Sequence, residues 1–184
     1  MGDTKMSWVI EPSHSVLEFS ARHLGISTVK GSFGSFTGSL DYDEEDPTRS
    51  TGTVEVHVHS LNTRDEKRDA HLRSADFFDA DNHPKATFGT REILPAGEGR
   101  YKVKGDLTIR GTTRPVELDV ELTEVMTDPW GNTRVGVSVS GTINRTDFGL
   151  NWNQVLEAGR LLVGEKVRIT AEAELVRQEA AVAA

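Results

Sequence analysis

The sequence predicts an all-β protein whose antiparallel strands surround a single hydrophobic core. Val, Ile and Thr make up 42 of the 184 residues, and β-branched residues favour strands over helices. Apolar and polar residues alternate with a period of two through most of the chain, which is typical of strands that bury one face. The length fits one domain, and no linker or change of composition divides the sequence.

Eight segments carry the alternation. In one of them Leu118 and Val120 alternate with Glu117 and Asp119. Alternation on a single face is typical of antiparallel sheets, because strands of parallel sheets are covered on both faces and are apolar throughout. Eight such strands fit a sandwich or a closed barrel, and only closure removes the sheet edges. The segments are 15–24, 28–40, 53–61, 85–93, 100–111, 114–125, 134–145 and 164–176.

The second segment is unusually rich in glycine. Gly31, Gly34 and Gly38 are interspersed with Phe33 and Phe36. Glycines inside a strand indicate a bend or a bulge, so we expect the sheet to curve here. An eight-stranded barrel can be filled by its own side chains or can hold a small ligand. The alternation alone does not decide between a packed and a hollow interior.

A charged stretch between the third and fourth segments breaks the pattern. Asn62 or Thr63 is expected to cap a short surface helix over residues 65–73. Phe77 and Phe78 follow directly, and two adjacent aromatic side chains need a place to be buried. We therefore expect this segment to pack over one end of the barrel.

The domain is expected to span residues 7–176, with flexible ends at 1–6 and 177–184. The longest uncharged runs cover about ten residues, whereas a transmembrane helix needs about twenty. The N-terminus has no apolar stretch of the kind found in signal peptides, so we expect a soluble, cytoplasmic protein. A net charge of -8 without a basic run argues against nucleic-acid binding.

Catalytic and metal-binding motifs find little support. The chain has no Cys, and it contains neither a GxSxG nucleophile elbow nor a glycine-rich phosphate loop. His57 and His59 have a workable metal-ligand spacing, but with Glu55 they are predicted on the solvent-exposed face without a third ligand. His23 is predicted on an apolar face. We expect no catalytic residue, no cofactor and no metal site.

Four ordered blocks resemble the YceI-like family and together cover nearly the whole chain. The first is IEPSHSVLEFSARHLGISTVKGSF at 10–33, and the second is SLNTRDEKRDAHLRSADFFDADNHPKATF at 60–88. The third is KGDLTIRGTTRPVELDVEL at 104–122, and the last is GTINRTDFGL at 141–150. Four blocks in the same order make the resemblance specific.

The resemblance implies a lipocalin-like, extended eight-stranded antiparallel β-barrel whose interior holds a long isoprenoid or similar apolar lipid, such as an isoprenoid quinone. It implies binding, transport or storage of that lipid without catalysis. Polar candidates near one end are His23, Arg145 and Asp147, although we expect Arg145 and Asp147 to form a structural ion pair instead. The candidate ligand-binding residues are Leu17, Phe19, His23, Phe33, Val54, Val56, Phe78, Phe88, Leu107, Ile109, Leu118, Val137, Val139 and Ile143.

Two other functions stay open at this point. The protein could be an enzyme that acts on such a lipid, which requires polar groups that converge at the cavity. It could also be a packed barrel that binds other proteins. The sequence leaves both a monomer and a homodimer open, and it does not identify the lipid.

Overall fold

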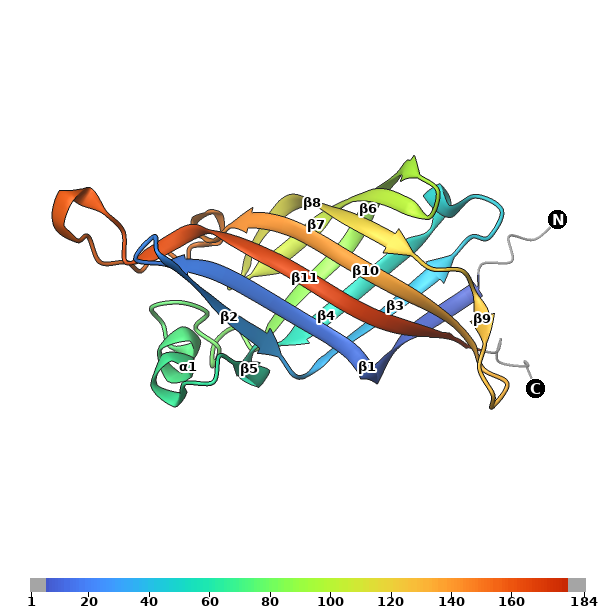
Figure 1. Cartoon of the computed structure of the whole chain (residues 1–184), viewed down its shortest axis with the longest axis horizontal. Helices are drawn as coiled ribbons and strands as arrows, with labels where there is room; N and C mark the ends of the chain where they lie inside the picture. The colour runs from blue at the N-terminus through green and yellow to red at the C-terminus, as the bar shows by residue number, and fades with distance from the viewer. Residues whose placement is uncertain (1–5, 179–184) are drawn as a thin grey trace.

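A computed structural model describes residues 6–178 as an elongated antiparallel β-barrel with one α-helix at one end (Figure 1). The all-β prediction and the single short helix are confirmed. The helix is α1 (Glu66–Arg73), and four 3₁₀ turns are η1 (Pro47–Arg49), η2 (Val58–Ser60), η3 (Arg145–Phe148) and η4 (Glu157–Gly159). The strands are β1 (Met6–His23), β2 (Ser27–Phe33), β3 (Phe36–Tyr42), β4 (Thr51–His57), β5 (Leu61–Asn62), β6 (Lys85–Gly97), β7 (Arg100–Ile109), β8 (Thr112–Leu122), β9 (Met126–Thr127), β10 (Thr133–Asn144) and β11 (Val163–Arg177).

The sheet closes on itself. Its strand order is β11-β10-β8-β7-β6-β4-β3-β1, and β1 pairs again with β11. These eight positions enclose the interior, so the sequence predicted a barrel of the correct size. Two of the eight places in the barrel are each occupied by two successive strands. Strands β3 and β2 both pair with β1, one after the other along its length. Strand β4 pairs with β3, and β5 pairs with β2.

The interruption between β2 and β3 lies in the glycine-rich segment. The amides of Gly34 and Ser35 donate to the carbonyl oxygen and the Oγ of Ser60, at 3.2 and 3.0 Å. Ser60 belongs to η2, which interrupts the neighbouring line between β4 and β5. The two breaks therefore stabilise each other, and the bend expected in residues 28–40 occurs at Gly34 and Ser35.

Strand β1 is longer than the segment predicted at 15–24. It begins at Met6, and its pairing with β11 shifts between Glu11 and Val16. The bulge between these residues interrupts the alternation of apolar and polar side chains. The periodicity therefore does not predict the first half of the strand. That half carries Trp8, which is fully buried against side chains of β10 and β11 and closes one end of the barrel.

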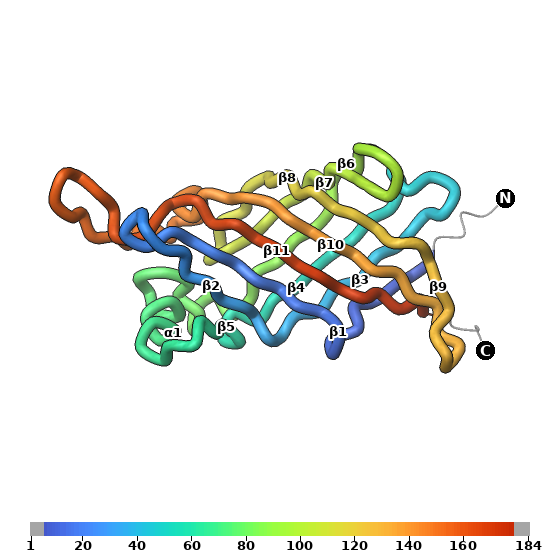
Figure 2. The backbone as a smooth tube through the Cα atoms, viewed as in Figure 1, coloured from blue at the N-terminus to red at the C-terminus, as the bar shows by residue number. Residues whose placement is uncertain are grey.

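The two ends of the described chain lie at the same end of the barrel (Figure 2). Met6 and Arg177 belong to strands, and the amide of Gln178 donates to the carbonyl of Ser7 at 2.8 Å. The expected flexible ends therefore overlap the barrel at these positions. Residues 1–5 and 179–184 lie outside the described residues. No helix within 6–178 is long and apolar enough to cross a membrane.

The helix begins later than its predicted caps. Its N-cap is Asp65, whose carboxylate accepts from the amide of Arg68 at 2.9 Å. Thr63, one of the two predicted caps, instead donates its amide and hydroxyl to Asp69 Oδ1, at 2.8 and 2.5 Å. The prediction of Asn62 or Thr63 as the cap is wrong, because a carboxylate within the helix holds Thr63 in place.

The segment after α1 packs against the end of the barrel, as expected. Phe77 is 4% exposed, and its ring lies 5.4 Å from that of Trp152. Phe78 meets Phe33 of β2 edge-on, with ring centroids 5.9 Å apart. Phe77 thereby joins the helical segment to the hairpin at Trp152, and Phe78 joins it to β2.

Inward-facing glycines make room for large neighbours on the adjacent strand. A Cβ at Gly31 would lie 2.4 Å from the ring of Phe19, and one at Gly141 would lie 2.5 Å from a methyl of Leu118. A Cβ at Gly105 would lie 2.4 Å from both the Phe88 ring and the carbonyl oxygen of Gly89. A neighbouring residue therefore fills the space that each glycine leaves, so these glycines add little to the volume of the cavity.

We expect Gly105→Ala to destabilise the protein by about 1–3 kcal/mol, because the backbone oxygen of Gly89 cannot move aside as a side chain can. Chemical denaturation would measure this change. The matched control is Gly89→Ala on the neighbouring strand β6, where a Cβ would have no atom within 4 Å. The control should stay within about 1 kcal/mol of wild type. Equal losses in both variants would contradict this explanation.

Candidate functional site

A cavity of about 380 Å³ lies inside the barrel, within the size range of small-molecule sites. Its walls are the inward-facing side chains of the long strands, and its charged lining residues are Glu18 and Arg145. Glu18 lies between Leu17 and Phe19 on β1, so the alternation directs its side chain to the outer face. The interior surface is therefore almost wholly apolar.

Thirteen of the fourteen candidate ligand-binding residues line this cavity. They come from β1, β2, β4, β6, β7, β8 and β10, with Phe78 from the segment after α1. For the strand residues the alternation therefore gave the correct face, while contact with a ligand stays a prediction for all thirteen. They are Leu17, Phe19, Phe33, Val54, Val56, Phe78, Phe88, Leu107, Ile109, Leu118, Val137, Val139 and Ile143.

His23 is the exception, and it is absent from the cavity lining. It is the last residue of β1, where it pairs with Ser27 and Val163. The pairing with β11 is irregular between Ala21 and His23. The alternation that placed His23 inward therefore fails at this irregularity, although Ala21 does line the cavity.

Two tyrosines were missed as candidates. Tyr42 ends β3 and Tyr101 lies near the start of β7, and both line the cavity. Neither phenol oxygen makes a hydrogen bond to any residue in 6–178. Burial raises the pKa of Tyr42, and the nearby Tyr101 adds to this. Tyr101 lies within the alternating segment predicted at 100–111, whereas Tyr42 lies beyond the end of the segment predicted at 28–40.

Arg145 is buried and lines the cavity, with 5% of its surface exposed. Its guanidinium donates to backbone carbonyls on both sides of the 151–162 hairpin. Burial lowers the pKa of Arg145. Its acceptors are the carbonyl oxygens of Gly164 (2.9 Å), Leu150 (2.5 Å), Trp152 (2.9 Å) and Val163 (3.2 Å).

The expected ion pair between Arg145 and Asp147 does not form. Asp147 is exposed, and its backbone oxygen accepts from Arg114 Nε at 3.2 Å. Both residues lie in the turn η3, but the side chain of Arg145 is buried and Asp147 is exposed. They are therefore close in sequence without forming an ion pair. The role of Arg145 is to hold the base of the hairpin.

His57 and His59 do not share a strand face. Strand β4 ends at His57, and His59 lies in η2. His57 Nε2 lies 3.8 Å from Glu55, and His59 Nε2 lies 3.4 Å from Asp81, so each imidazole has a different acidic neighbour. The common register assumed for these two histidines is wrong, because a 3₁₀ turn replaces the end of the predicted strand.

Residues 8–175 match the family of YceI-like domains. This chain belongs to the YceI-like family. A UPF0312 protein of Staphylococcus aureus (strain N315) is 41% identical over 169 residues, which are 91% of this chain and 96% of that protein. The family resemblance of the four sequence blocks is thereby confirmed.

Solved structures share the fold of this YceI-like protein. BcnA of Burkholderia cenocepacia has a TM-score of 0.79 at 21% identity and covers 90% of this chain and 98% of its own. The YCEI protein of Campylobacter jejuni has a TM-score of 0.74 at 29% identity, over 86% and 90%. A polyisoprenoid-binding domain from Saccharophagus degradans has a TM-score of 0.68 at 16% identity, over 93% and 98%.

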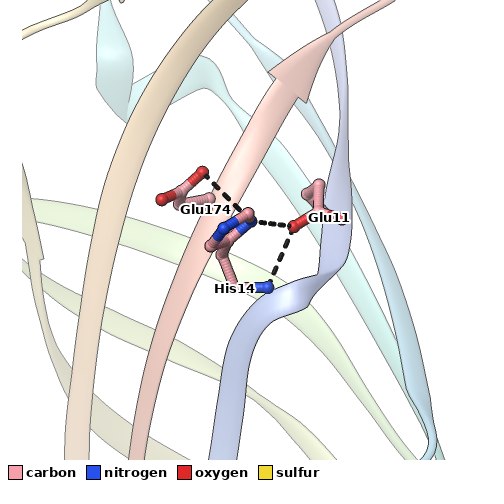
Figure 3. A group of neighbouring side chains, drawn as sticks. All are labelled: Glu11, His14 and Glu174. Carbon is pink, nitrogen blue, oxygen red and sulfur yellow. Dashed lines mark hydrogen bonds and ion pairs between the residues drawn. The ribbon is translucent and has the colours of Figure 1, made fainter.

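The YceI-like barrel also brings together a histidine and two glutamates at the bulge of β1 (Figure 3). His14 Nδ1 lies 2.7 Å from Glu11 and 4.0 Å from Glu174. The ligand atoms of this trio lie within 4.8 Å of one another, a spacing that suits a cation. However, Arg134 lies 2.8 Å from the same Glu174 oxygen and supplies the positive charge. The contacts indicate a network of ion pairs that joins the bulge to β11 rather than a metal centre.

Glu11 organises this bulge. One carboxylate oxygen accepts from the amide and hydroxyl of Ser13 at 3.2 and 2.7 Å, and the other accepts from the amide of His14 at 2.9 Å. Hydrogen bonds from Ser13 and then His14 lower the pKa of Glu11 from 4.5 to about 2. The EPSHS run at residues 11–15 therefore has a structural explanation in this chain.

We expect Glu11 to stabilise the fold in a pH-dependent way. Because its pKa is lowered on folding, its contribution is complete above pH 4.5 and is lost as the pH falls towards 2. Glu11→Gln should therefore melt earlier than wild type at neutral pH, and the difference should shrink between those two values. Thermal unfolding at a series of pH values measures this. Glu121→Gln, on an exposed face of β8, is the control, and the same pH dependence there would refute the role of Glu11.

Proposed function

We propose that this protein binds a long apolar lipid, of the isoprenoid class, inside the barrel and carries or stores it without catalysis. The observation that carries the proposal is the apolar cavity along the barrel interior. Membership of the YceI-like family and the fold shared with a solved polyisoprenoid-binding domain support it.

The cavity suits an extended hydrocarbon chain for a simple physical reason. A prenyl chain has no charge to recognise, so it is stabilised by removing its surface from water, at about 0.8 kcal/mol for each buried CH₂. The strands that form the walls have up to 18 residues, whereas about 5–6 is usual. A long barrel therefore buries more of a long chain, and affinity should rise with chain length.

Two tyrosines in the cavity wall are candidates for contact with a polar head group. Tyr42 and Tyr101 line the cavity, and their phenol hydroxyls have no partner among residues 6–178. A phenol hydroxyl both donates and accepts hydrogen bonds, so it would bind a carbonyl or hydroxyl oxygen of a lipid head. An isoprenoid quinone has such oxygens.

We expect the double variant Tyr42→Phe/Tyr101→Phe to bind an isoprenoid quinone roughly tenfold more weakly, since each lost hydrogen bond is worth about 0.5–1.5 kcal/mol. Binding of a hydrocarbon of similar length without a polar head should be unchanged. Titration of both ligands, followed by tryptophan fluorescence, measures the difference. Equal weakening for both ligands would show that the tyrosines only shape the wall.

Mass spectrometry of an organic extract of the purified protein tests the proposed function. The expected result is an isoprenoid or similar long-chain lipid in stoichiometric amount. An extract without lipid, together with failure to take up added isoprenoid quinone, would overturn the proposal and favour a packed protein-interaction module. Chemical conversion of the added lipid would favour an enzyme.

A further inference from the structure

One end of the barrel carries a protruding tip, which consists of residues 24–26 and 151–162 (Figure 1). The first part is the turn between β1 and β2, and the second is a hairpin between η3 and β11. The amide of Leu24 donates to the carbonyl of Leu162 at 2.9 Å, and Val155 forms a β-bridge with Leu161. The two parts therefore make one surface.

Apolar side chains of the tip are exposed to solvent. Ile26 is 75% exposed, Val155 is 73% exposed and Leu161 is 37% exposed. Single exposed apolar residues are common on protein surfaces, but a group of them at a protruding point is characteristic of contact sites. Because these side chains are exposed, they add little to the stability of the isolated fold. Their position favours contact with another molecule.

Basic residues surround the tip. Segments 22–30 and 150–168 contain five Lys or Arg and two Asp or Glu, although acidic residues outnumber basic ones in the whole chain by 29 to 21. All five basic side chains are exposed, and none forms an ion pair with a carboxylate among residues 6–178. They are Arg22, Lys30, Arg160, Lys166 and Arg168.

The opposite end also has exposed apolar side chains, but acidic residues flank them in the chain. Met126 and Trp130 are 63% and 82% exposed there. The neighbouring segments 41–46 and 120–132 contain five and three acidic residues and no Lys or Arg. Exposed apolar side chains therefore occur at both ends, and the charges of the chain segments that flank them differ.

We propose that the tip docks on the surface of a lipid bilayer with anionic headgroups. Basic side chains contact the headgroups while the apolar side chains enter the interfacial region, as in other proteins that bind bilayer surfaces. The acidic segments at the opposite end are repelled and point away. Leu150 and Val163, at the base of the hairpin, line the cavity, so docking places the cavity beside the bilayer. This last step rests on the proposed function, whereas the docking itself does not.

Co-sedimentation with vesicles tests the docking. The full chain should bind vesicles of equimolar phosphatidylcholine and phosphatidylglycerol, bind phosphatidylcholine vesicles weakly, and dissociate as the salt concentration rises. Ile26→Ser/Val155→Ser should weaken binding by roughly tenfold or more, since two apolar side chains no longer enter the bilayer. Lys166→Gln/Arg168→Gln should weaken binding only to the anionic vesicles.

The matched control is Met126→Ser/Trp130→Ser, which removes exposed apolar side chains at the acidic end and should leave binding unchanged. Equal binding by the Ile26→Ser/Val155→Ser variant and wild type, or loss only in the control variant, would overturn the proposal. Light scattering of the same proteins adds a further outcome. If the tip variant changes a dimer into a monomer and wild type does not bind vesicles, the tip joins two copies of the chain instead.

Uptake of isoprenoid quinone from detergent micelles separates the docking from the proposed function. The tip variants should take up the lipid from micelles as wild type does, because none of the replaced residues lines the cavity. Vesicle binding without any lipid uptake would leave the docking intact and overturn the proposed function. Lipid uptake without vesicle binding would do the reverse.

Discussion

Val139→Trp should abolish uptake of a long-chain lipid while the fold remains stable. Val139 lies on β10 between Ala171 of β11 and Val120 of β8, and all three line the cavity. Val139 belongs to neither of the buried clusters that close the two ends of the barrel. An indole at this position enters empty space and occupies the path of the lipid chain. We expect binding to fall by at least tenfold and the free energy of unfolding to change by less than about 1 kcal/mol.

The neighbouring positions supply the controls. Ser140→Trp lies one residue further along β10 on the outer face and should leave lipid uptake unchanged. Val137→Trp faces inward but packs against the cluster around Trp8, so it should overpack that cluster and cost about 1–3 kcal/mol. Lipid titration and chemical denaturation of the three variants measure both quantities. A large loss of stability in Val139→Trp with undisturbed lipid uptake would show that the barrel is packed at this level.

Arg145→Ala should be the most destabilising single change at the helical end. The guanidinium satisfies carbonyls on both sides of the 151–162 hairpin, and its removal leaves buried acceptors without donors. Each hydrogen bond from a charged group is worth about 1.5–3 kcal/mol, so we expect a loss of about 3 kcal/mol or more. Arg145→Lys should rescue little, because an ammonium cannot reproduce the planar array of donors.

Hydrogen exchange separates this local role from a general loss of stability. The amides of Leu156 and Leu162 bond within the hairpin and should lose protection first when Arg145 is replaced. Arg114→Ala is the matched control, since Arg114 is exposed and donates one hydrogen bond to the same turn from outside. Its cost should stay below about 1.5 kcal/mol. Wild-type stability in Arg145→Lys would contradict the proposed holding role.

The sequence by itself determined which side chains face inward along the regular strands. The inward side of β10, with Val137, Val139 and Ile143, follows from alternation alone, because a strand can bury only every second residue when one face is solvated. The same rule placed Phe88 and Leu107 in the cavity wall. The strongly charged stretch after β5 likewise required a helix outside the sheet, and its two phenylalanines required burial.

The tertiary structure decided every feature that depends on contacts between distant segments. The bulge at Glu11 shifts the register of β1, and the shift became visible only through the pairing with β11. His23, His59 and Asp147 were misplaced for a related reason: each lies where a regular strand ends, and the alternation of side chains stops there. Alternation continues only as far as the ladder of hydrogen bonds is regular. The hollow interior also needed the structure, because the same pattern fits a packed barrel, and only the spacing of facing strands fixes the volume between them.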